Sequence, residues 1–122
     1  MKISILTENT VYKRGFLGEH GLSVFIEYQG KKYLFDTGQS QVFLHNAAKL
    51  CVDLKELDGI ILSHGHYDHC GGMDYIYKLE EEIPVYVQAK AFEKKYAENL
   101  KTKELRYIGM EDQAGWQEQE NR

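Results

Sequence analysis

The sequence predicts an α/β domain in which a mixed β-sheet carries helices on one face. The first 36 residues contain three strand-like segments, and a short hairpin turn separates the last two. From residue 40 onward, segments with helical periodicity alternate with short apolar strands. A hairpin followed by alternating helices and strands is typical of a layered α/β architecture built on one mixed sheet.

Strands are expected where polar and apolar residues alternate, or where β-branched and aromatic residues gather. Residues 2–7 alternate in this way, and residues 21–29 contain Val, Phe, Ile and Tyr. A polar loop over residues 8–20 separates these two strands. The pair Gly30-Lys31 then turns the chain into a third strand at residues 32–36. Later strands are expected at residues 58–63, 84–88 and 104–108.

Helices are expected in three segments with helical spacing, at residues 40–50, 73–81 and 89–100. In the first of them Phe43, Ala47 and Leu50 recur on one side, and Ser40 is the expected N-cap. Residues 53–56 predict a short capped helical turn between this helix and the next strand. Each helix is therefore placed between two strands.

Size and charge argue against several classes of protein. With 122 residues, 43% hydrophobic and 28% charged, the chain has the composition of a soluble globular protein. We assign residues 1–110 to one domain and expect the polar residues 111–122 to fray. A net charge of −4 provides no basic surface for nucleic acid, and no run of about 18 apolar residues exists to span a membrane. Two cysteines and no signal-peptide pattern favour a cytoplasmic protein with reduced thiols.

The most informative segment is His64-Gly-His66-Tyr-Asp68-His69, which holds three of the five histidines within six residues. Imidazole and carboxylate groups are preferred ligands of zinc and similar divalent ions. In an extended segment alternate side chains point the same way, so His64, His66 and Asp68 can share one side. His69 breaks the alternation and can turn toward a second ion. We expect a metal site here, just past a strand's carboxyl end, where α/β folds place their sites.

Three segments resemble markers of one family. The histidine segment resembles the HxHxDH motif of the metallo-β-lactamase-fold hydrolases, and Phe35-Asp-Thr-Gly38 resembles that family's second marker. Residues 17–27 resemble one branch, which contains the methanopterin-pathway dihydropterin–ribofuranosylaminobenzene phosphate synthase. The resemblance covers residues 2–108, and it implies the N-terminal half of an αββα sandwich.

The resemblance also implies a role for each matching residue. His64 and His66 are implied to bind the first of two metal ions, and Asp68 and His69 the second. Zinc is the leading ion, with manganese or iron as alternatives. Asp36 is implied to be a supporting carboxylate that orients the histidine loop. Asp68 is also the candidate catalytic residue, because its carboxylate could accept a proton from the attacking water.

Glu19 and His20, at the end of the first polar loop, have two open interpretations. In the first, the two side chains line the substrate pocket. In the second, they form a solvated pair on the loop surface. The sequence favours neither interpretation over the other.

The implied activity is metal-dependent hydrolysis, in which a metal-activated hydroxide attacks an ester, lactone or phosphodiester-type bond of a small-molecule substrate. The family's later metal ligands have no counterpart here, because His69 is the last histidine of the chain. We therefore expect the parent protein to be an enzyme and this chain to be its N-terminal half. A half-sandwich exposes an apolar sheet face, so a second copy or a C-terminal half is expected to cover it. Two alternatives remain open: a transferase like the pterin-pathway synthase, and a catalytically incomplete half-domain that self-associates.

Overall fold

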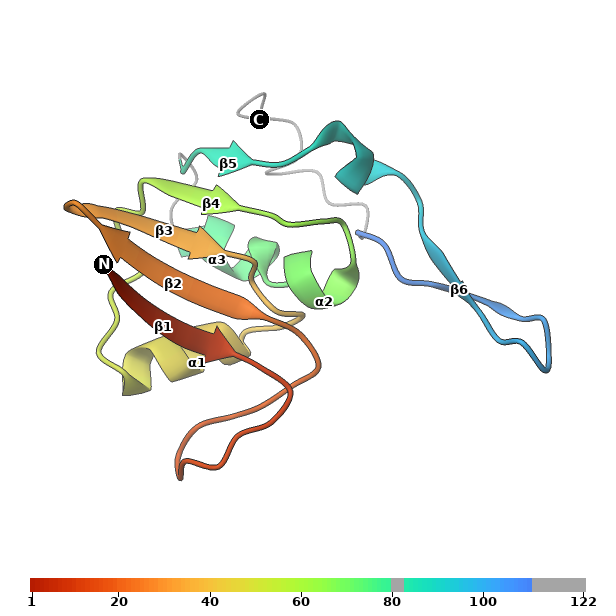
Figure 1. Cartoon of the computed structure of the whole chain (residues 1–122), viewed down its shortest axis with the longest axis horizontal. Helices are drawn as coiled ribbons and strands as arrows, with labels where there is room; N and C mark the ends of the chain where they lie inside the picture. Colours follow the sequence, from red (N-terminus) through yellow and green to blue (C-terminus); the bar gives the residue numbers. More distant parts are fainter. Residues whose placement is uncertain (80–82, 111–122) are drawn as a thin grey trace.

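The computed structural model describes residues 1–79 and 83–110, which form a five-stranded sheet in the order β1-β2-β3-β4-β5 (Figure 1). β1, β2 and β3 pair antiparallel, whereas β3, β4 and β5 run parallel. The expected mixed sheet is therefore confirmed. Its strands are β1 (Lys2–Thr7), β2 (Ser23–Tyr28), β3 (Lys31–Phe35), β4 (Gly59–Ile61) and β5 (Val85–Tyr86). The expected frayed tail at residues 111–122 lies outside the described residues.

Helices lie on one face of this sheet, as expected (Figure 1). They are α1 (Val42–Lys49), α2 (Tyr67–Cys70) and α3 (Met73–Leu79). Residues 80–81 of the helix expected at 73–81 lie outside the described residues. Strand residues such as Phe25, Leu34 and Ile60 point into this layer and are fully or almost fully buried. They share one core with Phe43 of α1 and Ile76 of α3. The core therefore fixes the elements on both sides of the histidine segment.

The opposite face of the sheet is apolar, and no described helix covers it (Figure 1). Strand register places these residues on it: Ile3, Ile5, Val24, Ile26, Tyr33, Phe35, Ile61 and Tyr86. Ile3 and Ile5, on the edge strand β1, are 55% and 54% exposed. Soluble monomers rarely expose a contiguous apolar surface that spans a whole sheet. In the described part of the chain this face has no covering layer.

The expected helix at residues 89–100 is wrong. A single 3-10 turn, η1 (Ala89–Phe92), is followed by a two-stranded sheet of β6 (Tyr96–Glu98) and β7 (Leu105–Tyr107). The ammonium group of Lys95 donates to three backbone carbonyls in residues 90–93 and so ends the helical turn. One tyrosine from each strand then packs across the hairpin, with ring centroids 5.5 Å apart. Pairing of β6 with β7, which lies beyond residue 100, thus overrides the helical propensity of this segment.

Three smaller expectations need correction. The N-cap of α1 is Gln41 rather than Ser40, because the Ser40 hydroxyl donates to Glu19 and lies one residue before the cap. Residues 53–56 form a turn without helix, in which the Asp53 carboxylate accepts the Lys55 N–H at 2.9 Å. The strands expected at residues 58–63, 84–88 and 104–108 are present but shorter.

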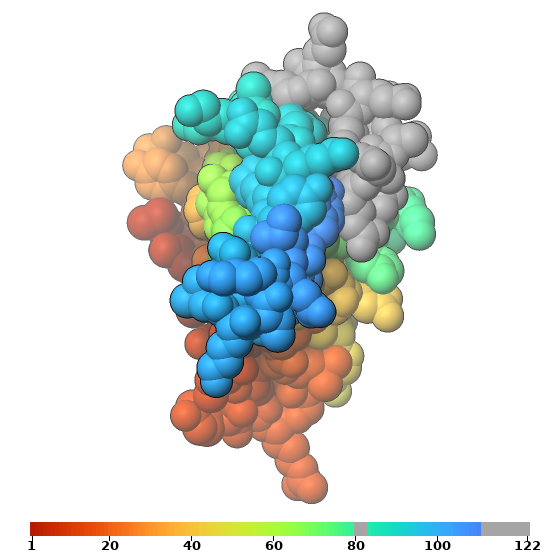
Figure 2. All heavy atoms as spheres, turned by 90° about the vertical axis from the view of Figure 1, so that its right-hand side faces the viewer, coloured from red at the N-terminus to blue at the C-terminus, as the bar shows by residue number. Residues whose placement is uncertain are grey.

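The hairpin of β6 and β7 projects from the end of the sheet at which β3 and β4 terminate (Figure 1). Viewed from that end, it stands in front of the molecule, with the loop of residues 8–20 below it (Figure 2). Its base is tied to the histidine segment, because the Tyr67 N–H donates to the Ile108 carbonyl at 3.0 Å. The hairpin and the loop therefore flank the histidine segment. Across residues 1–79 and 83–110, no helix is long and apolar enough to cross a membrane.

Candidate metal centre

β3 and β4 end side by side, and this brings Asp36 next to the histidine segment. The two strands are parallel, with Phe35 opposite Ile61, so the residues that follow them emerge at the same edge of the sheet. Asp36 follows β3 directly and is fully buried. Its φ of +57° is a left-handed conformation that Asp and Asn adopt more readily than most other non-glycine residues. In this conformation the Asp36 carboxylate meets Ser63, two residues beyond β4.

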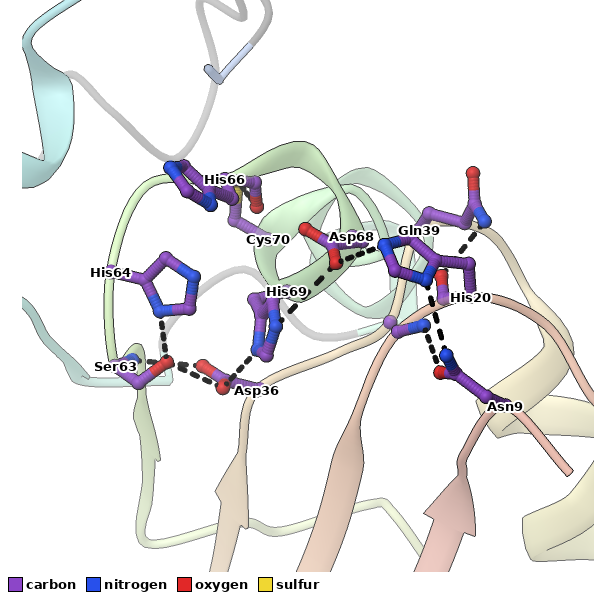
Figure 3. A network of polar contacts seen from close by, with 12 residues as sticks. Asn9, His20, Asp36, Gln39, Ser63, His64, His66, Asp68, His69 and Cys70 are labelled. Carbon is purple, nitrogen blue, oxygen red and sulfur yellow. Dashed lines mark hydrogen bonds and ion pairs between the residues drawn. The ribbon is translucent and has the colours of Figure 1, made fainter. Parts of the chain in front are cut away.

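The Asp36 carboxylate is the centre of a hydrogen-bond network (Figure 3). Its Oδ1 accepts the backbone N–H of Ser63 at 2.8 Å. Its Oδ2 accepts the Ser63 hydroxyl at 2.6 Å and Nδ1 of His69 at 2.7 Å. A buried carboxylate needs such partners, because burial removes its hydration. All three donors lie in residues 63–69, so one side chain ties the start of the histidine segment to its end.

This network also determines which nitrogen of each ring can face a metal ion. An ionised carboxylate only accepts hydrogen bonds, so the Ser63 hydroxyl must donate to Asp36. The Ser63 oxygen lies 2.7 Å from Nδ1 of His64 and therefore accepts that ring's N–H. His69 likewise directs an Nδ1 proton at Asp36. In their neutral forms both rings present an Nε2 lone pair, the arrangement of metal-binding histidines whose second nitrogen is hydrogen-bonded.

Ser63 is a residue that sequence reasoning missed. It stands directly before the histidine motif, where a hydroxyl resembles an ordinary strand-end residue. Only its contact with Asp36, 27 positions earlier in the chain, shows that it links the carboxylate to His64. In the sequence, the only sign of this role is that Ser63 directly precedes the first histidine of the motif. That position becomes informative once the structure places Asp36 beside Ser63.

The three histidine rings of the motif form a compact group (Figure 3). Ring centroids lie 4.2 Å apart for His64 and His69, and 4.6 Å apart for His64 and His66. Burial lowers the pKa of His64 from its ordinary value, and the neighbouring His69 and His66 rings lower it further. Metal binding requires a neutral imidazole, so these surroundings favour the form of His64 that binds an ion.

Alternation of side chains predicts that His64, His66 and Asp68 share one side, but the structure brings a different set of residues together. Ligand-type atoms of Asp36, His64 and His69 all lie within 4.8 Å of one another. Asp36 fits a supporting role better than a ligand role, because both of its oxygens already accept hydrogen bonds from the protein. His66, at the N-cap of α2, and Asp68, in the first turn of α2, stand outside this group of three.

Asp68 lies close to His69 from within the same short helix. Its Oδ2 is 3.6 Å from Nε2 of His69. Two ligands on one tetrahedral zinc ion, each about 2.1 Å from the metal, are separated by about 3.4 Å. The observed separation therefore fits the expected pairing of Asp68 and His69 at one ion. The same Asp68 oxygen also lies 3.0 Å from Nε2 of His20 (Figure 3).

Glu19 and His20 are adjacent in sequence but face different partners. The Glu19 carboxylate accepts the backbone N–H groups of Gln39 at 3.1 Å and Ser40 at 3.2 Å, as well as the Ser40 hydroxyl. Glu19 therefore braces the loop before α1. The His20 ring instead faces Asp68 and is 63% exposed. Of the two residues, His20 is the one that contacts the candidate metal ligands.

Backbone packing holds the histidine segment in place from two sides. The N–H and the hydroxyl of Thr37 both donate to the His69 carbonyl, at 2.8 and 3.1 Å. A Cβ added at Gly72 would lie 2.5 Å from the Thr37 carbonyl oxygen, so the close approach requires glycine. On the other side, a Cβ at Gly65 would overlap the carbonyl oxygen of Ala91 in η1. The loop after β3 and the turn η1 thus clamp the segment between them.

Cys70 adjoins the motif but does not fit as a ligand. It is buried, and its Sγ donates to the His66 carbonyl at 3.1 Å. Burial raises the pKa of the Cys70 thiol to about 12. Metal binding needs a thiolate, so this thiol acts as a small packing group at the base of α2.

The chain also matches known proteins in sequence. Residues 17–115 match the family described as the metallo-beta-lactamase superfamily. An uncharacterised protein of Methanocaldococcus jannaschii is 40% identical over 114 residues, which cover 91% of this chain and 41% of that protein. The 7,8-dihydropterin-6-methyl-4-(β-D-ribofuranosyl)-aminobenzene-5'-phosphate synthase of the same organism is 38% identical over 104 residues, which cover 80% and 35%. The resemblance to the branch of this synthase is therefore confirmed.

A solved structure extends the agreement to the fold. Tm1679, described as a metal-dependent hydrolase of the β-lactamase superfamily, matches with a TM-score of 0.68 and 35% identity. The match covers 89% of this chain and 36% of that one. The chain thus spans between 35% and 41% of the length of these three proteins. Its sequence match and its mixed sheet agree, and the chain belongs to the metallo-β-lactamase superfamily.

Proposed function

We propose that this chain supplies the histidine-loop part of a metal-dependent hydrolase that acts on an ester, lactone or phosphodiester-type bond. The observation that carries the proposal is the network around Asp36. That carboxylate, directly and through Ser63, turns the Nε2 lone pairs of His69 and His64 outward. Burying a carboxylate costs free energy unless hydrogen bonds compensate for its lost hydration. Packing alone is therefore a poor explanation for a buried carboxylate beneath two imidazoles. A metal-binding role accounts for both its burial and its partners.

The donor set fits zinc, with manganese or iron as alternatives, because imidazole and carboxylate ligands suit all three ions. In this proposal His64 and His66 hold one ion, and Asp68 and His69 hold another. Such an ion lowers the pKa of water toward neutrality and polarises a carbonyl or phosphoryl oxygen of the substrate. Asp68 contacts His20 and His69 through Oδ2, so we assign the acceptance of a proton to its Oδ1.

The histidine motif by itself offers fewer donors than two catalytic ions usually have. A catalytic zinc ion usually has three protein ligands, and the motif offers two for each ion. His45 lies on α1 and binds the Gly15 carbonyl at 2.9 Å, so it serves a different part of the structure. We propose that the other donors come from protein packed on the uncovered sheet face, either a second copy or the remainder of a longer protein. A small-molecule substrate would then bind between the two layers' loops.

The test is metal content, measured by elemental analysis of the purified chain and again after titration of a chelator-stripped sample. We expect zinc to bind at a stoichiometry of about one or two ions per chain, depending on how far the site is completed. His66→Ala should abolish or strongly weaken binding, while His45→Ala, outside the motif, should leave it unchanged. Unchanged metal content in His66→Ala would refute the ligand assignment. In this proposal two ligands of each ion lie in this chain, so a wild-type chain that binds no zinc even in the titration would refute the proposed function.

A transferase is the second candidate, because one relative, 38% identical to this chain, is named as a synthase of a pterin compound. A pterin titration followed by fluorescence separates the two candidates. Tight pterin binding, with no hydrolysis of aryl phosphodiesters or lactones by the metal-loaded protein, would favour the transferase. Hydrolysis without pterin binding would favour the hydrolase.

A further inference from the structure

We propose that Asn9 and His20 form a positioning pair for Asp68. In this proposal Asn9 holds His20 in the tautomer whose proton is on Nε2, and that proton holds the Asp68 carboxylate in the orientation that a metal ion requires. The inference rests on the proposed function, since it assigns a support to one of the proposed ligands. His20 is therefore a positioning residue, in contrast to a residue that touches substrate.

The tautomer follows from the orientation of the Asn9 amide. The backbone N–H of Gly21 lies 3.1 Å from Asn9 Oδ1, and a backbone N–H can only donate. The oxygen of the amide must therefore face Gly21, which leaves Nδ2 to face Nδ1 of His20 at 3.2 Å. An amide nitrogen also only donates, so His20 Nδ1 must accept. In neutral His20 the proton then sits on Nε2, 3.0 Å from Oδ2 of Asp68 (Figure 3).

The backbone around His20 is tied to the metal segment, so the contact does not depend on an exposed side chain alone. The Leu22 N–H donates to the Asp68 carbonyl at 3.3 Å. Gly21, with a φ of +148°, lies so close that an added Cβ would overlap the same Asp68 oxygen. The Gln39 amide donates to the His20 carbonyl at 2.8 Å. Residues 20–22 are therefore held against α2 independently of the His20 ring.

The arrangement leaves Asp68 able to bind an ion. A carboxylate oxygen has two lone pairs, so Oδ2 can accept the His20 proton and still face His69 and a metal. His20 itself cannot act as a further ligand in this tautomer, because its Nε2 carries the proton. Each proposed ligand of this ion thus has its own support: a buried carboxylate behind His69 and an imidazole behind Asp68. Hydrogen-bonded partners of this kind orient ligands and raise metal affinity.

The first measurement is the nitrogen-15 spectrum of the histidine rings in the metal-free protein. We expect His20 Nδ1 to resonate as an unprotonated nitrogen and Nε2 as a protonated one. Asn9→Leu removes the amide donor, so in this variant the Nδ1 resonance should shift toward that of an unprotonated nitrogen without a hydrogen bond. A wild-type His20 with its proton on Nδ1 would overturn the proposal, and so would an Asn9→Leu variant with an unchanged spectrum.

The second measurement is zinc affinity, obtained by competition with a chromophoric chelator. His20→Leu should weaken binding about 10-fold, the lower end of the loss seen when such supports are removed. His20→Gln keeps an N–H donor near the position of Nε2 and should recover most of the affinity. His45→Leu is the matched control and should bind as the wild type does. Wild-type affinity in His20→Leu, or no recovery in His20→Gln, would overturn the positioning role.

The proposed function is tested in the wild-type chain, whereas the positioning role is tested by comparing His20→Leu with the wild type. If the wild-type chain binds no metal, the proposed function is refuted before any substitution is made, and the positioning role falls with it. If the wild type binds zinc and His20→Leu binds it equally well, the positioning role alone is refuted. Thermal unfolding of each variant, followed by circular dichroism, checks that the exposed substitutions leave the fold intact.

Discussion

Replacing Asp36 with Asn perturbs the network beneath the histidines at its centre. Asn has nearly the same size and tolerates the left-handed conformation at this position, where φ is +57°. Its Oδ1 can still accept the Ser63 N–H. An amide NH₂ group replaces Oδ2, however, so a donor now faces both the Ser63 hydroxyl and the His69 Nδ1 proton. The substitution therefore changes hydrogen-bond chemistry without creating a cavity.

The magnitude follows from the two hydrogen bonds that Oδ2 accepts. Each is charge-assisted and contributes about 1.5–3 kcal/mol, and removing the buried charge offsets part of their loss. We expect the free energy of unfolding of the metal-free chain to fall by about 2–4 kcal/mol. His69 can restore one contact by moving its proton to Nε2, but this blocks the lone pair that faces the metal. Zinc affinity should therefore fall about 10–100-fold.

Urea denaturation followed by circular dichroism measures the first quantity, and chelator competition measures the second. Asp58→Asn is the matched control, because Asp58 also accepts a backbone N–H, that of Lys32 at 2.8 Å, but its side chain is partly exposed. This variant should lose less than about 1 kcal/mol and keep its zinc affinity. An Asp36→Asn variant with wild-type stability and affinity would show that the network does not orient the histidines. Equal losses in both variants would show a general effect of removing a carboxylate.

Three further predictions concern other parts of the molecule. At mildly alkaline pH a thiol reagent should label exposed Cys51 and leave Cys70 unlabelled, because burial raises the pKa of the Cys70 thiol to about 12; two adducts by mass spectrometry would contradict this. Gly65→Ala should cost about 1–3 kcal/mol in urea denaturation, because the new Cβ overlaps the Ala91 carbonyl oxygen; an unchanged midpoint would show that η1 moves freely. Ile26→Lys, on the uncovered sheet face, should convert a self-associated wild type to monomer in sedimentation velocity. A wild type that is already monomeric would exclude a second copy as the covering layer.

The hairpin half of the fold could be predicted from local sequence. Residues 2–7 alternate, and Gly30 lies at the turn between two strands that pair in register from Tyr28 opposite Lys31 onward. These features can be predicted because residues that are close in the sequence make the contacts between the strands. The structure of the segment after residue 89 could not be predicted in this way. Its charged residues suit a helix, but the helical turn ends at Phe92, and β6 pairs with a strand that begins seven residues after β6 ends.

In the candidate site, too, some features could be predicted from the sequence and others could not. The residue types and spacing of the histidine motif predicted metal binding, because ligand chemistry is a property of the side chains themselves. The family resemblance added the supporting role of Asp36, and the network around that residue agrees with it. The sequence could not reveal Ser63, since its role depends on a contact between the ends of two parallel strands.

The sequence by itself determined the fold class and the cluster of candidate metal-binding side chains, because alternation, periodicity and ligand type are local properties of the chain. Its motifs also pointed to the superfamily by resemblance. Only the tertiary structure decided which ring nitrogen of His64 and of His69 is left for a metal ion, that His20 lies against Asp68, and that one side of the sheet has no covering layer among the described residues. These features depend on the distances between segments that lie far apart in the chain. Such distances are set by the packing of the core and the register of the sheet.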